Sequence, residues 1–403
     1  MFPTKTLILV AVTGIMVYLI WNKYRRWQNG KQSEALFLEN QETACKGTSD
    51  ESIFISVPSY RDPECVRTLV DCFQKATCPF RIFVGVCVQD EAYDPNPEVE
   101  YRSMVSRGMT RDFYDQIRFV RIPARDAKGP MYARSLIEQQ LYRGEKYYLM
   151  IDSHTRFIAG WDEECIKEFK RCLQDCPKPV LTMYPNDFVA SDRSGFTKMG
   201  ASCESAIPLY LRAKEWCTET GALKIEGALF SSMPLRPLPS LFWGACFSFS
   251  SGKMIQECPM DPNLHYLFFG EEHLMALRYF THGYDFFTPC RSIVRHKWSR
   301  EGRRGTFWEQ WTNNKDKVLQ ERISRDRLQM MLGLKTHGPP LNPLYGFGRE
   351  RPATAYFAYS GAYPSTRALT PEAKLGILAT ARQDEIICKF GSETKLKKLR
   401  EKV

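Results

Sequence analysis

The sequence predicts an α/β protein with a mostly parallel central sheet flanked by helices. Strand-like and helix-like segments alternate along the chain, which is typical of strands connected by crossover helices. Residues 147–151 are apolar throughout, as a strand buried on both faces should be. The 403 residues are 43% hydrophobic and 25% charged, a globular composition that excludes a disordered chain, a collagen and a multi-span transporter.

The predicted elements follow one another in a regular order. Strands are expected at residues 53–57, 81–88, 117–122 and 147–151. Helices are expected to begin near Pro63, Pro130 and Trp161, the first two followed by apolar residues at helical spacing. In such sheets ligands bind outside the carboxyl ends of the strands, so functional residues are expected there.

The N-terminus carries a candidate membrane anchor, because residues 7–21 are uncharged and almost wholly apolar. The run is short against the roughly 17–25 residues of a spanning helix, but Thr6 and Asn22 can extend it. The bulky, basic residues that follow lack a small-x-small pattern, which favours an uncleaved anchor over a signal peptide. We expect an anchor with its basic flank at 1–27, a stem at 28–50, one folded domain at 51–365 and a basic helical tail at 366–403.

The formal net charge of +10 gathers near the two ends of the chain. Lysines and arginines crowd residues 23–31 and 395–402, and no zinc finger, RNA-recognition signature or basic-aromatic stripe lies between them. We therefore expect no nucleic-acid partner. The positive charge that follows the apolar run argues for a body in the cytosol, and the absence of Asn-x-Ser/Thr sequons argues in the same direction.

An acid and an imidazole follow the predicted strand at 147–151. Asp152 and His154 are alternate residues, so both side chains can point at one site. A carboxylate oxygen with an imidazole nitrogen suits a borderline divalent cation such as Mn²⁺. An isolated motif of this length is more often a turn-capping Asp beside a surface His. The apolar strand before it and the helix after it favour the metal site here.

Two carboxylates follow a second apolar segment. Gly270, Glu271 and Glu272 open a helix that continues through Leu274 and Leu277. Acidic residues are common at helix N-termini because of the helix macrodipole. That preference accounts for one glutamate, but less well for a pair preceded by glycine, so both are candidate functional residues.

A third cluster lies further along the chain. His296 lies at the end of a predicted strand, where it can complete a metal site with Asp152 and His154. Arg300 and neighbouring arginines lie in a Gly-containing loop and can bind phosphates as bidentate donors. Without the other two clusters, a solvated basic loop would be the default interpretation.

Motifs spread over residues 52–365 resemble one family of transferases. They lie at residues 55–62, 127–134, 144–157, 160–162, 242–245, 270–272, 345–351 and 359–361. Together they resemble the Skp1 hydroxyproline N-acetylglucosaminyltransferases and their mucin-type polypeptide relatives, glycosyltransferase family 60. More distantly, the chain is similar to polypeptide N-acetylgalactosaminyltransferases, which share the Asp-x-His element and a later metal histidine.

This resemblance implies a GT-A fold, a UDP-GlcNAc donor and a divalent cation, Mn²⁺ or Mg²⁺. Metal ligands would be Asp152, His154 and His296. Donor-binding residues would be Ser56, Pro58 and Arg61 at the first strand end, Asp90 toward uracil, Arg134 and Asp152 near the diphosphate or sugar, Trp243 and Gly244 on the sugar loop, and Arg300. Glu271 or Glu272 would hold sugar hydroxyls or orient the acceptor hydroxyl, with Arg134 as the third catalytic candidate.

The expected activity is metal-dependent transfer of GlcNAc from UDP-GlcNAc to a hydroxyl of a polypeptide, hydroxyproline or Ser/Thr, with retention of configuration. By resemblance to anchored relatives, the body would face the Golgi lumen in type II topology, with the cytosolic face as the alternative. Two other functions stay open: the same fold using UDP-GalNAc or a glycan acceptor, and an inactive membrane-anchored sugar-binding protein. A nuclease-like enzyme is disfavoured because the sequence lacks its paired-metal carboxylate cluster.

Overall fold

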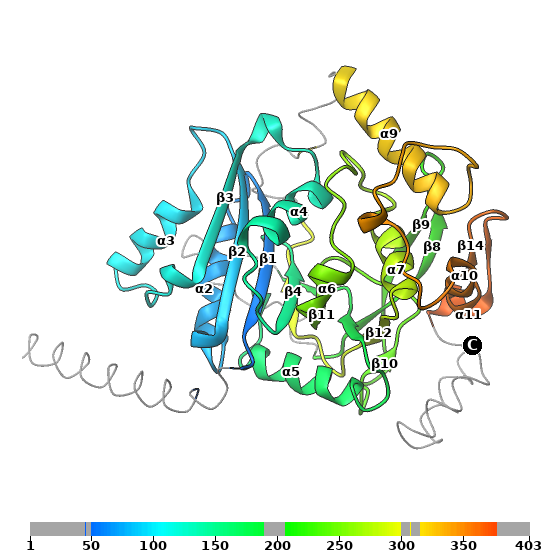
Figure 1. Ribbon diagram of the computed structural model, residues 1–403. Coiled ribbons are helices and arrows are strands. Elements are labelled where there is room, and N and C mark those ends of the chain that lie inside the picture. The colour runs from blue at the N-terminus through cyan, green and yellow to red at the C-terminus, as the bar shows by residue number, and fades with distance from the viewer. Residues whose placement is uncertain (1–44, 46–49, 189–205, 300–306, 308–314, 377–403) are drawn as a thin grey trace, which may run out of the picture. The chain divides into compact units, whose positions relative to one another are not determined.

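The computed structural model describes residues 45, 50–188, 206–299, 307 and 315–376 (Figure 1). The chain forms two units, Met1–Asp50 and Glu51–Val403, and every element below belongs to the second. Within the described residues, no helix is long and apolar enough to cross a bilayer. The expected anchor at 1–27, Arg300 and the tail beyond residue 376 lie outside the described part of the chain.

An eight-stranded mixed sheet forms the centre of the second unit, in the order β10-β12-β6-β11-β4-β1-β2-β3. Its strands are β1 Ile53–Tyr60, β2 Ile82–Asp90, β3 Ile117–Pro123, β4 Tyr147–Ile151, β6 Pro179–Thr182, β10 Leu238–Pro239, β11 Phe247–Ser251 and β12 Asp285–Thr288. Four of the seven neighbouring pairs are parallel: β4-β1, β1-β2, β2-β3 and β6-β12. The sheet is therefore mostly parallel, as predicted, but β11 lies antiparallel between β4 and β6.

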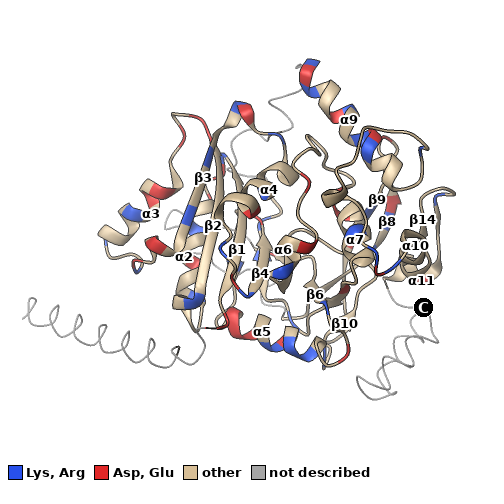
Figure 2. Cartoon of the chain, viewed as in Figure 1, with Lys and Arg blue, Asp and Glu red and all other residues tan. Residues whose placement is uncertain are grey.

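Successive residues of the central strands face opposite layers of the unit. In β1, Ile53 and Ile55 pack in one hydrophobic cluster and Phe54 packs in the other. In β4, Leu149 and Met150 divide in the same way. A strand covered on both faces needs uncharged residues at every position, which explains why β1 and β4 carry no charged side chain (Figure 2).

Helices cover both faces of the sheet (Figure 1). The first cluster includes residues of α2 (Cys65–Lys75), α3 (Pro97–Ser106) and α5 (Trp161–Cys172). The second includes residues of α4 (Pro130–Leu141), α6 (Lys253–Glu257), α7 (Glu271–Thr281), α9 (Lys315–Met331) and α10 (Ala353–Ser360). The core thus consists of two apolar layers with the sheet between them.

Smaller sheets complete the unit. One has the order β5-β13-β7, with β5 Thr155–Phe157, β13 Val294–His296 and β7 Asn186–Asp187. Two hairpins are β8–β9 (Leu209–Trp216, Leu223–Leu229) and β14–β15 (Ala362–Tyr363, Ala368–Leu369), and α11 spans Pro371–Leu375. The pairing of β5 with β13 matters for function, because it brings the end of β13 beside the turn that follows β4.

Within residues 51–365, the predicted strands and helices are all present. β4 has the predicted bounds, whereas β1 and β2 continue to Tyr60 and Asp90, beyond their expected ends. The apolar run of β1 stops early because Ser56 and Ser59 are polar, yet both are completely buried in the strand. The longer strands carry the chain up to the sheet edge where a ligand would bind.

Candidate active site

A cavity of about 450 Å³ opens at the carboxyl ends of β1, β2 and β4. This is the edge where α/β sheets bind ligands. Its wall includes most of the expected site residues: Pro58, Arg61, Arg134, Asp152, His154, Glu271, Glu272 and His296. The fold therefore gathers around one cavity residues that lie far apart in the sequence.

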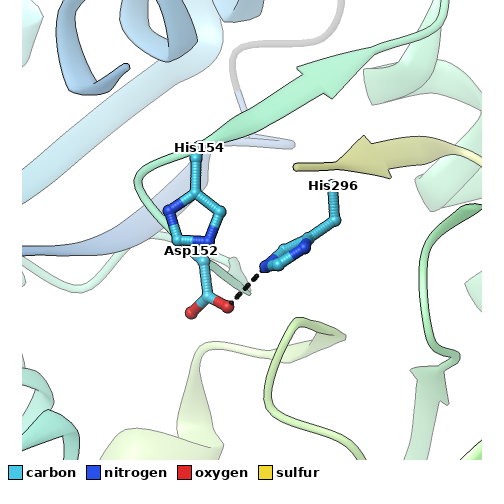
Figure 3. A group of neighbouring side chains, drawn as sticks. All are labelled: Asp152, His154 and His296. Carbon is cyan, nitrogen blue, oxygen red and sulfur yellow. Dashed lines mark hydrogen bonds and ion pairs between the residues drawn. The ribbon is translucent and has the colours of Figure 1, made fainter. Parts of the chain in front are cut away.

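Asp152, His154 and His296 converge on one point of this wall (Figure 3). Each offers one ligand atom, and these atoms lie within 4.8 Å of one another. His296 Nε2 lies 3.0 Å from Asp152 Oδ2, and the centroids of the two imidazole rings are 4.4 Å apart. One carboxylate and two imidazoles suit a borderline divalent cation such as Mn²⁺, so this donor set fits the expected metal.

The ladder between β5 and β13 explains how a distant histidine reaches the Asp-x-His turn. In the antiparallel register His296 lies opposite Thr155. Beside this pair, the backbone N–H of Lys297 donates to the carbonyl of His154 at 3.1 Å. Because the ladder fixes both backbones, the two imidazoles lie side by side.

A buried arginine connects Asp152 to the glutamates. Arg134 Nη2 lies 3.0 Å from Asp152 Oδ1, and Arg134 Nη1 lies 2.5 Å from Glu271 Oε1. Burial by itself raises the pKa of Asp152, but the hydrogen bond with His296 and the charge of Arg134 outweigh it and hold that pKa well below its usual range. Asp152 therefore stays ionised, the state in which a carboxylate binds a cation.

Glu271 and Glu272 form the first turn of α7. Gly270 before them has a φ of +128°, and a Cβ there would lie 2.4 Å from a leucine side chain, so both conformation and space require glycine. Glu272 Oε2 accepts from the hydroxyl of Tyr184 at 2.6 Å, and Oε1 accepts from the backbone N–H of Ala245 at 3.0 Å. Burial raises the pKa of Glu272 to about 7 although both hydrogen bonds oppose it.

His273 has a different role from the two glutamates before it. It does not line the cavity, and its Nδ1 accepts from the backbone N–H of Leu223 at 3.0 Å. Burial lowers its pKa to about 4, so the ring is neutral at pH 7. His273 thereby anchors the start of β9 to α7, and the next residues of β9, Lys224 and Ile225, line the cavity.

The end of β1 leads into Arg61, whose backbone is strained. Its φ of +49° lies in the left-handed region, which residues other than glycine rarely adopt. Its guanidinium makes two hydrogen bonds to Asp94, at 2.7 and 3.1 Å, and its backbone N–H donates to Asp90 Oδ1 at 3.1 Å. Burial, with the charge of Asp94, raises the pKa of Asp90 to about 6. Asp90 lies next to Gln89, which lines the cavity.

Two of the expected donor residues are completely buried and do not line the cavity. Ser56 lies inside β1. The Trp243 indole has no exposed surface; its Nε1 donates to Ser248 Oγ at 2.8 Å and its ring packs against Tyr279. The structure thus gives Trp243 a core position, because its large apolar ring completes the second hydrophobic cluster.

Gly244 also lies behind the wall. A Cβ at this position would lie 2.9 Å from the ring of Tyr184, so glycine allows the close approach of that tyrosine. The next two residues, Ala245 and Cys246, do line the cavity. Trp243 and Gly244 therefore support the segment that forms the wall.

The wall also contains residues that the sequence patterns did not single out. Tyr184 follows β6, and Asp62 follows Arg61 at the end of β1. Phe268, Phe269 and Trp298 are half-exposed, at 51%, 47% and 43%. For Tyr184 and Asp62, the sequence offered one signal, a position just after a strand. The three aromatic residues lie beside motifs, but no sequence pattern separates an exposed aromatic residue from a buried one.

Three solved structures that are similar to this chain share little sequence with it. GalNAc-T7 with UDP, GalNAc and Mn²⁺ is 12% identical with a TM-score of 0.46, over 70% of this chain and 50% of that one, so the match spans half of its length. The mannosyltransferase PcManGT from Pyrobaculum calidifontis with GDP-Man and Mn²⁺ is 11% identical over 87% and 78%, with a TM-score of 0.37. S. aureus TarS 1-349 is 8% identical over 70% and 83%, with a TM-score of 0.38. Likenesses this distant assign neither donor nor acceptor.

The sequence match is more extensive. No curated protein matches the chain. A family model described as Glycosyltransferase (GlcNAc) matches residues 52–113 and 98–365, which is most of the chain and includes every element of the cavity wall. With this match around a cavity that holds a candidate metal site, the chain belongs to the Glycosyltransferase (GlcNAc) family and is a glycosyltransferase.

Proposed function

We propose that this chain is a GT-A enzyme that transfers GlcNAc from UDP-GlcNAc to a polypeptide hydroxyl, with Mn²⁺ or Mg²⁺ and with retention of configuration. The observation that carries the proposal is the convergence of Asp152, His154 and His296 beside Arg134 in one cavity. The family description names GlcNAc, which supports the choice of sugar.

The leaving group determines what this part of the cavity has to do. Breaking the bond between sugar C1 and the diphosphate develops negative charge on UDP, and a bound divalent cation stabilises that charge. Asp152, His154 and His296 would hold the cation. Arg134 holds Asp152 ionised and oriented, and its burial protects this ion pair from screening by water.

The two glutamates at the start of α7 have different proposed roles. Glu271 is already paired with Arg134. Glu272 is held at both oxygens by Tyr184 and Ala245, and a carboxylate oxygen can accept a second hydrogen bond. We therefore propose that Glu272 binds a sugar or acceptor hydroxyl and that Glu271 positions Arg134.

The nucleoside would dock at the ends of β1 and β2. Pro58 and Gln89 line this side of the cavity, next to Asp90. Because the guanidinium of Arg61 is bound to Asp94, Arg61 contributes here through its backbone N–H, which orients Asp90. Asp90 would then accept from the uracil N–H.

The aromatic residues on the wall support a polypeptide acceptor. Phe268, Phe269 and Trp298 present half-exposed rings, and Lys224 Nζ lies 4.5 Å from the ring centroid of Phe269. Burying such rings stabilises a complex with apolar side chains, whereas a glycan needs partners for many hydroxyls. Aromatic rings also stack on sugars, so a glycan acceptor is the alternative to be tested.

The test is a panel of donors and acceptors with the full chain. We expect transfer from UDP-GlcNAc to a hydroxyproline or Thr-rich peptide, dependent on Mn²⁺ and stopped by EDTA. A preference for UDP-GalNAc would show that the proposed donor is wrong. Transfer only to a free glycan would show that the proposed acceptor class is wrong. Absence of both transfer and UDP-sugar hydrolysis with every donor would contradict the proposal and support a binding protein.

We also propose that residues 1–27 anchor the enzyme in the Golgi membrane with the body in the lumen. The support is the apolar run at 7–21 and the resemblance to anchored relatives. Protease treatment of intact microsomes decides the side: a luminal body survives until detergent is added. Digestion without detergent would place the enzyme and its acceptors in the cytosol.

A further inference from the structure

We infer that Asp62 is a positioning residue for the metal site, because its carboxylate fixes the imidazole of His154 with Nε2 available to a cation. This inference rests on the proposed metal-dependent function. Asp62 lies in the turn between β1 and α2, lines the cavity and is not one of the three candidate ligands.

Three hydrogen bonds define the orientation of Asp62. Its Oδ2 lies 2.7 Å from His154 Nδ1 and also accepts from Ser153 Oγ at 2.7 Å. Its Oδ1 accepts from the backbone N–H of Glu64 at 2.9 Å. Both side chains of the Asp62–His154 pair are largely buried, at 7% and 13% exposed, so water competes little for this contact.

The contact selects one tautomer of His154. Both oxygens of Asp62 already act as acceptors, Oδ1 from the backbone N–H of Glu64 and Oδ2 from the hydroxyl of Ser153, as the oxygens of an ionised carboxylate do. His154 Nδ1 must then carry the proton, which leaves the lone pair on Nε2. Histidines that bind metals commonly donate their other ring N–H to such a carboxylate, and losing that partner costs about 10–100-fold in metal affinity.

The backbone around this pair is also held in place. Thr68 Oγ1 on α2 lies 2.6 Å from the carbonyl of Ser153 and 3.0 Å from that of Thr155. The turn that carries His154 is therefore fixed to α2 independently of Asp62. A change of Asp62 should alter the orientation of the imidazole while the turn itself stays in place.

Asp62→Ala and Asp62→Asn in the full chain test the assignment. Alanine removes the acceptor. Asparagine can accept on one side only, so it cannot serve both Glu64 N–H and His154. The matched control is Asp71→Asn, which alters a half-buried carboxylate that accepts from the backbone N–H of Phe157 outside the cavity.

The primary measurement is the Mn²⁺ dissociation constant by electron paramagnetic resonance, without donor or acceptor. We expect about 10–100-fold weaker binding in Asp62→Ala, a smaller loss in Asp62→Asn and none in Asp71→Asn. Nitrogen NMR of histidine-labelled protein, with the His154 signal assigned by its loss in His154→Gln, should show Nδ1 protonated in the wild type and a mixed tautomer in Asp62→Ala.

The outcomes separate this inference from the proposed function. If the wild type binds no Mn²⁺ or Mg²⁺, the metal-dependent function is wrong. If the wild type binds Mn²⁺ and Asp62→Ala binds it equally well with the same tautomer, the function stands and the role of Asp62 is wrong.

Discussion

Arg134 Nη1 lies 2.5 Å from Glu271 Oε1, and the same guanidinium reaches Asp152 with its other nitrogen. The arginine is almost completely buried, and it is the countercharge for the buried carboxylate of Glu271 and the partly exposed carboxylate of Asp152. Removing one partner of a buried ion pair is far more costly than losing an exposed pair, because the remaining charge stays buried without compensation.

Arg134→Ala should therefore lower the free energy of unfolding by about 3–5 kcal/mol, measured by urea denaturation. The control Arg212→Ala breaks a partly exposed pair with Glu226 and should cost about 1 kcal/mol or less. The double variant Arg134→Ala/Glu271→Ala should be less destabilised than the sum of its single variants, because neither charge of that pair remains. Equal stability of Arg134→Ala and Arg212→Ala would show that Arg134 does not stabilise the fold as a buried countercharge.

Much of this site was predictable because it follows a strand. Asp152 and His154 come directly after β4, whose apolar run has the same bounds in sequence and structure. The strand pattern therefore located both residues at the functional edge. His296 was assigned to the same site from its position at a strand end and from the family resemblance. The β5–β13 register explains physically why it lies there, because it pairs His296 with Thr155, the residue after His154.

Other parts of the site depend on contacts that no local pattern encodes. Tyr184 and Glu272 are 88 residues apart, and only the folded chain brings their side chains within 2.6 Å. Trp243 lies in a motif next to the wall, but whether a tryptophan faces a cavity or the core depends on its tertiary neighbours. Likewise, the antiparallel position of β11 between β4 and β6 follows from topology, which alternating patterns do not specify.

His296→Ala should abolish metal-dependent transfer while the protein stays folded. The substitution removes one of three ligand atoms, and losing this stabilisation of the leaving group should lower kcat on the order of 100-fold or more. Activity across a Mn²⁺ titration, with circular dichroism for the fold, measures both effects. His337→Ala, at an exposed position, is the control. Unchanged activity and metal dependence in His296→Ala would remove this histidine from the site.

Phe269→Ala should raise KM for a peptide acceptor by about fivefold to thirtyfold and leave kcat and KM for UDP-GlcNAc nearly unchanged. Its half-exposed ring lies on the cavity wall, and truncating an aromatic contact of this kind commonly costs about 1–2 kcal/mol of binding. Leu235→Ala is the control, because Leu235 is more exposed and does not line the cavity. An increase in donor KM instead would place the ring against the nucleotide sugar.

Glu138 provides the clearest pH dependence of stability. It is buried on α4, where Oε1 accepts from the hydroxyl of Tyr148 at 3.0 Å and Oε2 accepts from the backbone N–H of Met260 at 2.7 Å. Burial raises its pKa from 4.5 to about 7, although these hydrogen bonds oppose the shift. Between these two values the folded protein holds a proton that the unfolded chain has released.

The stabilising effect of that proton is present below pH 4.5 and is lost as pH rises through about 7. The loss amounts to about 3 kcal/mol by linkage. Glu138→Gln cannot ionise, so the variant should gain stability relative to the wild type by about this amount between pH 4.5 and pH 8, measured by urea denaturation at each pH. Burial also raises the pKa of Glu272, so Glu138→Gln should keep part of the dependence of the unfolding free energy on pH. Glu350→Gln, at an exposed position, should follow the wild-type curve. If the unfolding free energy of Glu138→Gln depended on pH as steeply as that of the wild type, Glu138 would already be ionised in the folded protein near pH 4.5.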